Sequence, residues 1–267
     1  HVTIPNSVTD LGEWTFNGCS GLADVTIPNS VTNIRGWAFA GCAGLTRMML
    51  PDSVTVIDHW AFKDCGGLTT LTIPASVTFI GVGAFNGCSR LLSVTVDAAN
   101  PAFSSSADGV LFDKEKTCLV SYPAGKAGSY VIPGGVTSIA AAAFSNCGSL
   151  TNVVFPNGLA SIGACAFDGC SGLTRVSIPQ GVTSIGGWAF QGCSSLTRIT
   201  IPASVTSIGR LALYRCKSLT GVYFEGDVPP VSEALFFPNS KATIYYRPGT
   251  KGWGKTFNGL PTAEWKQ

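Results

Sequence analysis

The fold is decided by a stretch of 23 residues that recurs along the chain; one copy, LTRMMLPDSVTVIDHWAFKDCGG, runs from Leu45 to Gly67. The common pattern is L-T-x-V-T-I-P-x-S-V-T-x-I-G-x-x-A-F-x-G-C-x-x. Cysteine recurs at this interval in two blocks, which are Cys19, Cys42, Cys65, Cys88 and Cys147, Cys170, Cys193, Cys216. A unit this short cannot bury its apolar side alone, so successive units must stack and share one core.

The pattern within each copy predicts short strands. Val25-Thr26-Ile27 alternates, which places the two apolar side chains inside, and Pro28 ends the strand because it cannot donate to a ladder. Val31 to Ile34 alternates again and predicts a second short strand. Gly36, or a glycine next to that position, permits a bend before the inward-pointing Phe39. We therefore expect a mainly β solenoid, a right-handed-type stack of parallel short strands with few or no helices.

The period is interrupted once. Two apolar runs, residues 110–112 and 118–120, flank the polar stretch 113–116, which predicts one irregular hairpin rung. Near the end, Thr243 to Tyr246 reads as a strand in a C-terminal β cap that covers the last open rung. Because His1 begins inside a repeat strand, we expect the chain to be part of a longer protein. The predicted segments are 1–96 (first repeat block), 97–132 (irregular hairpin-containing rung), 133–220 (second repeat block) and 221–267 (capping segment).

Composition excludes several classes of function. The 267 residues include 17 Lys and Arg and 15 Asp and Glu, and charged residues make up only 12% against about 25% in ordinary domains. So few basic residues argue against nucleic-acid binding. No apolar run reaches the roughly 18 residues that a membrane helix needs. With two histidines, no nucleophile elbow and no phosphate-binding loop, we predict no enzyme, no catalytic residues and no cofactor.

The repeat cysteines come singly, one per unit, whereas metal sites need ligands that converge in one shell. We predict no metal site. The eight thiols should instead form a buried ladder and pack as small apolar groups with weak S–H donors. Cys118 and Cys165 lie outside this ladder, and a disulfide that involves one of them stays open.

Two sets of surface residues are candidates for binding. On the outward side of the L-T-x-V-T-I-P strands, the chemically distinct residues are Arg47, Met49, Arg175, Arg198 and Tyr223. Solenoids present such strand surfaces to partners, and arginine is enriched at binding hot spots, although exposed arginines also simply maintain solubility. Two residues before the repeat phenylalanine, an aromatic strip is formed by Trp14, Trp37, Trp60 and Trp188. This strip could stack sugars or could merely roof the coil.

The repeat unit resembles the BspA-like, or Treponema-type, leucine-rich repeat family. The stretch from Asn100-Pro101 to Ile132 is similar to an insertion that recurs in that family, and Ala242 to Trp253 is similar to its terminal module. The resemblance implies a secreted or cell-surface protein of bacteria, or of some protists, that has no catalytic motif and takes part in adhesion.

We therefore predict a noncatalytic extracellular recognition module that binds a protein of a host, a matrix or a neighbouring cell through the strand surface. The alternatives are a carbohydrate or cell-wall binding module that uses the tryptophan strip, and a structural spacer.

Overall fold

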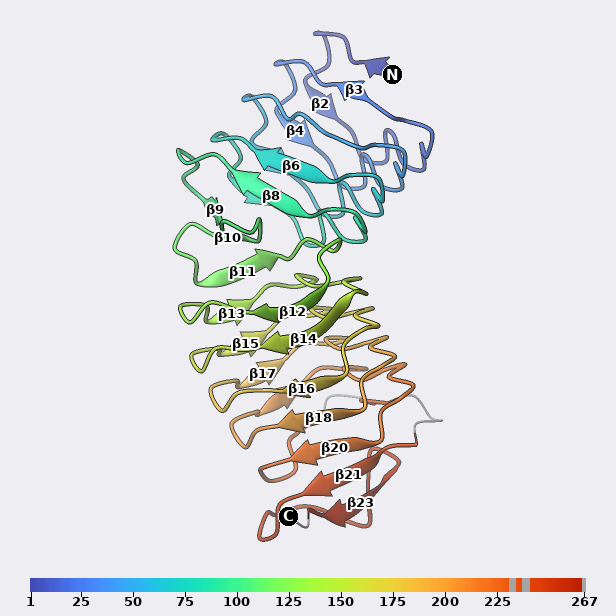
Figure 1. The fold of residues 1–267 in the computed structure, drawn as a ribbon, viewed down its shortest axis with the longest axis vertical. Coiled ribbons are helices and arrows are strands. Elements are labelled where there is room, and N and C mark those ends of the chain that lie inside the picture. Colours follow the sequence, from blue (N-terminus) through green and yellow to red (C-terminus); the bar gives the residue numbers. More distant parts are fainter. Residues whose placement is uncertain (231–233, 237–240, 266–267) are drawn as a thin grey trace. The chain divides into compact units, whose positions relative to one another are not determined.

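The protein consists of strands and turns. The computed structural model describes residues 1–230, 234–236 and 241–265, and within these ranges it has no helix. The chain divides into two compact units: unit 1 is His1–Lys126 with Ala143–Cys147, and unit 2 is Ala127–Ala142 with Gly148–Gln267. Within each unit, parallel strands from successive repeats stack as a β-solenoid (Figure 1), which confirms the predicted fold class.

Unit 1 has two stacks of short parallel strands and one antiparallel group. The first stack comprises β1 (Val2–Thr3), β3 (Val25–Thr26), β6 (Thr70–Ile73) and β8 (Ser93–Val96). The second comprises β2 (Asp10–Leu11), β4 (Asn33–Ile34), β5 (Val56–Ile57) and β7 (Phe79–Ile80). Paired residues lie one repeat apart, as Val2 with Val25, so each repeat supplies one step of both stacks.

Unit 2 repeats this plan. Its first stack comprises β12 (Gly128–Val131), β14 (Leu150–Val154), β16 (Arg175–Ser177), β18 (Arg198–Ile201), β20 (Gly221–Phe224), β21 (Thr243–Tyr246) and β23 (Leu260–Glu264). Its second comprises β13 (Ser138–Ile139), β15 (Ser161–Ile162), β17 (Ser184–Ile185) and β19 (Ser207–Ile208). We call the exposed side of the first stack in either unit the strand face.

The core of each unit is a set of columns of like residues. Val25 and Ile27 are buried and Thr26 is exposed, as predicted. Phe39 and Phe62 are fully buried, and their rings stack with centroids 5.3 Å apart and planes 1° apart. Columns of this kind form because a parallel ladder places the same side chain at the same depth in every repeat.

Two positions of each repeat have the left-handed backbone conformation. One lies two residues before the repeat phenylalanine, at Trp14, Trp37, Trp60, Gly83, Ala142, Cys165, Trp188 and Leu211, and the other directly before the repeat cysteine, at Gly18, Gly41, Asp64, Gly87, Asn146, Gly169, Gly192 and Arg215. Gly36 itself is not left-handed, whereas Gly83, at the neighbouring repeat position, is. At the repeat position just before that of Gly36, several repeats have a glycine, which allows close packing. In one of them, a Cβ on Gly186 would lie 2.4 Å from the backbone nitrogen of Ala164.

The irregular rung contains the predicted hairpin and a third strand. β10 (Leu111–Asp113) pairs antiparallel with β11 (Cys118–Ser121), and also with β9 (Phe103–Ser105), which the sequence analysis missed. The buried side chain of Asn100 holds the start of this rung. Its amide donates to the carbonyl oxygens of Pro74 and Val77, and its oxygen accepts from the amides of Ala102 and Phe103.

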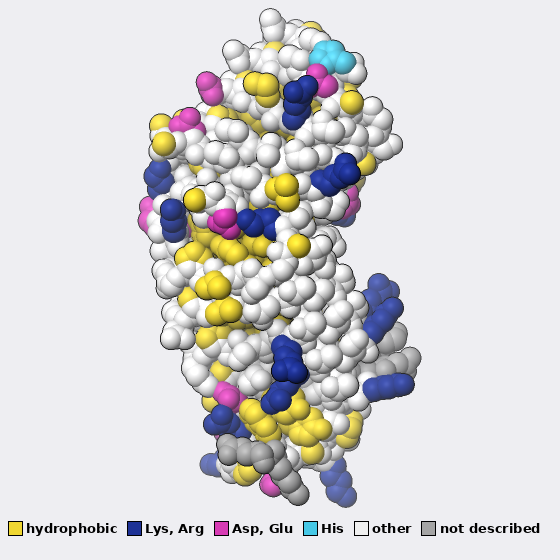
Figure 2. Space-filling model, viewed as in Figure 1, with side chains coloured by type: hydrophobic (Ala, Val, Ile, Leu, Met, Phe, Trp, Pro, Cys, Tyr) yellow, Lys and Arg dark blue, Asp and Glu magenta, His cyan; other side chains and the backbone are white. Residues whose placement is uncertain are grey.

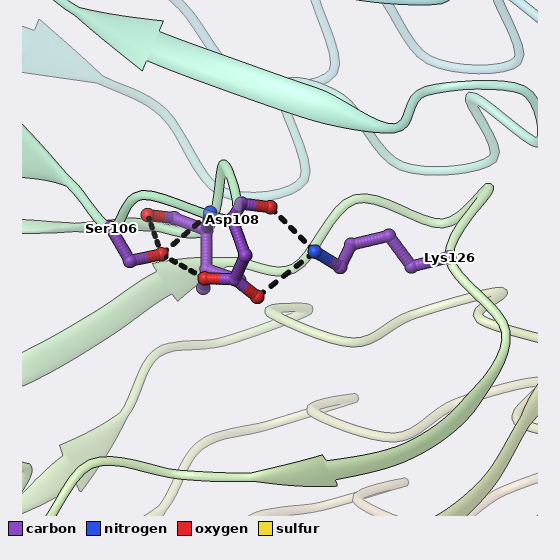
Figure 3. Close-up of polar contacts among 4 residues, drawn as sticks. Ser106, Asp108 and Lys126 are labelled. Carbon is purple, nitrogen blue, oxygen red and sulfur yellow. Dashed lines mark hydrogen bonds and ion pairs between the residues drawn. The ribbon is translucent and has the colours of Figure 1, made fainter.

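A polar clamp closes the same rung (Figure 3). The hydroxyl of Ser106 donates to the Asp108 carboxylate at 2.6 Å, and the ammonium group of Lys126 contacts the other carboxylate oxygen at 2.9 Å. Partial burial acts to raise the pKa of Asp108, but these two groups outweigh it and the pKa lies below its ordinary value. Gly109 then packs against Ser93, and its carbonyl oxygen accepts from the amide of Val94 on β8.

The C-terminal segment extends the strand face. The predicted strand Thr243–Tyr246 is present as β21 and pairs in parallel with β20. Beyond β20, β21 and β23 add two further parallel strands, and β22 (Thr256–Phe257) folds back on β23. Within the capping segment, Val231 and the dipeptide Asn239-Ser240 lie outside the described residues.

Candidate functional site: the strand face

The five predicted binding residues all belong to the strand face. Arg47, Arg175 and Arg198 are exposed, Met49 is 83% exposed, and Tyr223 is half-buried. Arg47 and Met49 lie in unit 1, and the other three lie together in unit 2. The register aligns Arg175 with Arg198, and Thr200 with Tyr223, on neighbouring strands. Whether these residues bind a partner stays a prediction.

Unit 2 has a groove on this face, which we call the Arg175 groove. It has a volume of about 540 Å³, and its lining residues include Asn152, Val154, Phe155, Arg175, Arg198 and Thr200. Figure 2 shows Lys and Arg side chains beside hydrophobic side chains over strands β16 to β21. The groove therefore offers cationic groups and apolar surface side by side.

The guanidinium group of Arg198 is held by aromatic rings. It lies 3.7 Å from the centroid of the Tyr223 ring and 5.6 Å from that of Trp265. Tyr223 in turn stacks on Tyr245 with centroids 4.7 Å apart. The ring of Tyr223 lies over Gly221, where a Cβ would be 2.6 Å from its Cε2 atom. Gly221 thus makes room for the ring that supports Arg198.

Unit 1 has a second groove, which we call the Arg47 groove. It has a volume of about 410 Å³, and its lining residues include Asp24, Thr26, Arg47, Met49 and Pro51. Unlike the Arg175 groove, it contains a carboxylate, because Asp24 lies in the same lining as Arg47. The Asp24 carboxylate also contacts Nδ1 of His1 at 2.9 Å.

The tryptophan strip is a stack of rings in unit 1. The ring centroids of Trp14 and Trp37 are 4.8 Å apart, and those of Trp37 and Trp60 are 5.1 Å apart. The Lys63 ammonium group lies 4.9 Å from the Trp37 centroid. The rings cover one another's faces, which are the surfaces that a sugar would need. Trp188, in unit 2, instead has the guanidinium group of Arg210 over its ring at 5.5 Å.

The cysteine ladder is buried, as predicted, apart from the exposed Cys19. The Cys65 thiol donates to the carbonyl oxygen of Phe39 at 3.1 Å, and the same contact recurs from Cys193 to Phe167 at 3.2 Å. No disulfide joins any of the ten cysteines, so the one that the sequence left open for Cys118 or Cys165 is not formed. Burial raises the pKa of the Cys216 thiol to about 12.

Three residues of the candidate site were not among the predicted binding residues: Tyr245, Trp265 and Val154. Tyr245 was predicted only as part of the strand Thr243–Tyr246 and Trp265 only as part of the capping segment, and only the register of β21 and β23 places them beside Tyr223. Val154 was visible as an apolar residue in an outward column, and it is 46% exposed. An exposed valine at an outward position was the signal that could have identified it.

In the described part of the chain, no three His, Cys, Asp or Glu side chains gather in a way that could hold a metal ion. In the same ranges, no helix is long and apolar enough to cross a membrane.

Comparisons with solved structures identify leucine-rich repeat proteins. A leucine-rich repeat protein from Eubacterium ventriosum is 28% identical with a TM-score of 0.76, and the match covers 91% of this chain and 71% of that one. A leucine-rich cell surface protein from Faecalibacterium prausnitzii is 30% identical with a TM-score of 0.62, covering 82% and 70%. The pneumococcal vaccine antigen PcpA, 22% identical with a TM-score of 0.65 and coverage of 91% and 68%, shares the fold.

A search of curated proteins found no match. The defining pattern of the BspA type leucine rich repeat region, in contrast, matches six copies over residues 1–107 and 122–243. These residues include most of both units, and the stacked 23-residue rungs are the structural form of the matched pattern. The chain therefore belongs to the BspA-type leucine-rich repeat family.

Proposed function

We propose that the chain is a noncatalytic recognition module at a cell surface, which binds protein partners through its strand face and so serves in adhesion. The observation that carries this proposal is the position of the two grooves. Each lies on the strand face, in a different unit: Arg47 lines one, and Arg175 and Arg198 line the other. All three arginines occupy the variable outward position of the repeat strand.

The mechanism of binding follows from the scaffold. Strand-face side chains project from hydrogen-bonded strands, so little conformational freedom is lost when a partner docks. Exposed Met49, Val131 and Val154 supply apolar contact, and the arginines supply charge and planar hydrogen-bonding groups. The cell-surface location is supported by the Faecalibacterium prausnitzii relative, which is a cell surface protein.

A protein partner is favoured over a glycan because the tryptophan rings of unit 1 cover one another's faces. A sugar would stack on an open ring face, whereas Trp37 has a neighbouring ring on each side, so within the stack only the outer faces of Trp14 and Trp60 remain for a sugar.

The proposal is tested by screening the purified chain, at physiological salt, against immobilised extracellular-matrix proteins and a glycan array. We expect a protein hit that Met49→Ser together with Arg175→Ala weakens. Phe79→Ser is the matched control, because Phe79 is 44% exposed but lies on β7 in the other stack. Binding that responds only to the control substitution, hits only among glycans, or no hit on either panel would refute the proposal, and the last result would favour a spacer.

A further inference from the structure

We propose that the Arg175 groove binds an acidic peptide segment that carries one apolar side chain next to its carboxylates. This inference rests on the proposed function and deepens it, because it names the chemistry of the partner at one groove. It is carried by the unbalanced charge of the groove, by the support of Arg198, and by apolar surface beside both arginines.

The charge of the groove is unbalanced. Arg175 and Arg198 occupy the same position on neighbouring parallel strands, and like charges directly across a ladder are destabilising. No Asp or Glu lines the groove. Among the residues that the structure describes, neither arginine has a carboxylate within ion-pair distance. A bound carboxylate would relieve this repulsion and accept hydrogen bonds from the guanidinium groups.

One of the two arginines is already positioned. The Arg198 guanidinium group lies over the Tyr223 ring, and the Trp265 ring meets Tyr223 edge to face beside it. These contacts restrict the orientation of the guanidinium group and leave its N–H groups available to donate to a planar anion. This support depends on Gly221, which follows Arg198 in the register and carries no side chain where the Tyr223 ring lies. Less freedom is therefore lost when an anion binds to Arg198 than when it binds to an unsupported arginine.

The apolar surface indicates a peptide rather than an anionic polysaccharide. Val131 and Val154 face each other across β12 and β14 and are 65% and 46% exposed. Val154 also lines the Arg175 groove. A sulfated or carboxylated sugar chain offers these valines only the C–H faces of its rings, whereas a peptide with a leucine beside an aspartate offers a full aliphatic side chain and a carboxylate to the two parts of the groove.

The Arg47 groove provides an internal comparison. It combines a single arginine with Met49, but Asp24 lies in its lining and supplies a carboxylate of its own. An acidic ligand would be repelled there by Asp24. The two grooves therefore predict different affinities for the same acidic probe, and Arg47→Ala serves as a matched control.

The test measures fluorescence anisotropy of three labelled, end-blocked hexapeptides with the full 267-residue chain at low and physiological salt. Their central residues are Leu-Asp-Glu, the neutral Leu-Asn-Gln, and Ser-Asp-Glu, which has no apolar side chain. We expect Leu-Asp-Glu to bind best, and its affinity to fall with salt. Arg175→Ala and Arg198→Ala should each weaken it by about tenfold or more, whereas Arg47→Ala should not.

Gly221→Ala tests the support of Arg198 without removing any charge. The added methyl group meets only the far end of the Tyr223 ring, which can swing away, so the fold is retained. We expect weaker binding of the acidic peptide by a variant whose circular dichroism spectrum matches that of the wild type.

Several results would overturn the inference. These are equal binding of all three peptides, no binding of the acidic ones, insensitivity to both unit 2 arginines, or competition by sulfated dextran with no preference for leucine. The last result would identify the groove as a polyanion site. If the peptides fail while Met49→Ser together with Arg175→Ala still weakens binding to a matrix protein, the proposed function stands and only this inference falls.

Discussion

The thiol ladder makes the protein sensitive to alkaline pH. Burial raises the pKa of Cys216 from 9.0 to about 12, and it also raises the pKa values of Cys193 and Cys147. For Cys65, a hydrogen bond with Cys88 is the main cause of the increase and burial adds to it. A folded-state pKa above the unfolded value favours the protonated thiol in the folded state. The stabilisation is complete below about pH 9 and is lost as the pH rises from 9 towards 12.

The magnitude follows from linkage. At pH 10 a thiol with an unfolded pKa of 9.0 is mostly ionised in the unfolded chain and still protonated in the folded one. This difference lowers the free energy of unfolding by about 1.4 kcal/mol per buried thiol. Three such thiols, Cys42, Cys65 and Cys147, lie in unit 1, and Cys193 and Cys216 lie in unit 2. Between pH 7 and pH 10 unit 1 should therefore lose about 4 kcal/mol and unit 2 about 3 kcal/mol, a large part of the roughly 5–15 kcal/mol that is typical of whole domains.

The assay is urea unfolding from pH 7 to pH 10.5 under reducing conditions, for the wild type and for Cys193→Ala. The variant lacks one titrating thiol, so the difference between the two free energies of unfolding should narrow by about 1.4 kcal/mol from pH 7 to pH 10. Val182→Ala is the control, because it truncates a fully buried side chain that does not titrate, and its curve should stay parallel to the wild type. Parallel curves for Cys193→Ala as well would refute the reasoning.

Three further predictions concern the core and the irregular rung. Phe62→Ala should lower the free energy of unfolding of unit 1 by about 3–5 kcal/mol in denaturant titrations, because it removes a fully buried ring from a stack. Phe62→Leu should cost much less, since Leu213 fills this position in another repeat, and equal costs would contradict the stacking argument. Asn100→Ala should cost about 3 kcal/mol or more in the same assay, because it leaves buried backbone groups without partners, and a loss below about 1 kcal/mol would show that water replaces the amide. A thiol reagent at pH 8 should label at most three cysteines of the native protein, namely Cys19, Cys118 and Cys165, because the other seven are buried. Labelling of more than three cysteines before unfolding would contradict the buried ladder.

The repeat was predictable because its period fixes both the register and the inward columns. Val25, Phe39 and Cys42 are buried where the spacing placed them, since a parallel ladder keeps each repeat position at one depth. The bend was located only approximately, because Gly36 suggested a flexible position, whereas the left-handed conformation is imposed by the turn on whichever residue follows, including tryptophan. β9 was missed because Phe103-Ser-Ser105 has no alternating apolar pattern.

The candidate site was only partly predictable, because some of its residues lie in the regular repeat and others lie beyond it. Arg175 and Arg198 stand out in one column of the repeat, so their neighbourhood follows from the period alone. Tyr245 and Trp265 lie beyond the last regular repeat, where no period indicates which strands pair. The support of Arg198 by Tyr223 also depends on Gly221, whose missing side chain matters only once the ring is seen above it.

The contact between each buried thiol and a carbonyl group of the preceding rung allows such a chain to evolve by gain or loss of whole repeats. Because the same parts meet at every step, deleting residues 43–65 would leave Cys88 facing the carbonyl oxygen of Phe39, which is the contact that Cys65 makes now. A gene can thus gain or lose whole repeats and lengthen or shorten the docking surface by about 4.8 Å each time, without redesigning an interface. A deletion one residue shorter would shift the next strand by one residue and turn its buried side chains to the solvent. Selection therefore retains changes in chain length that add or remove whole rungs.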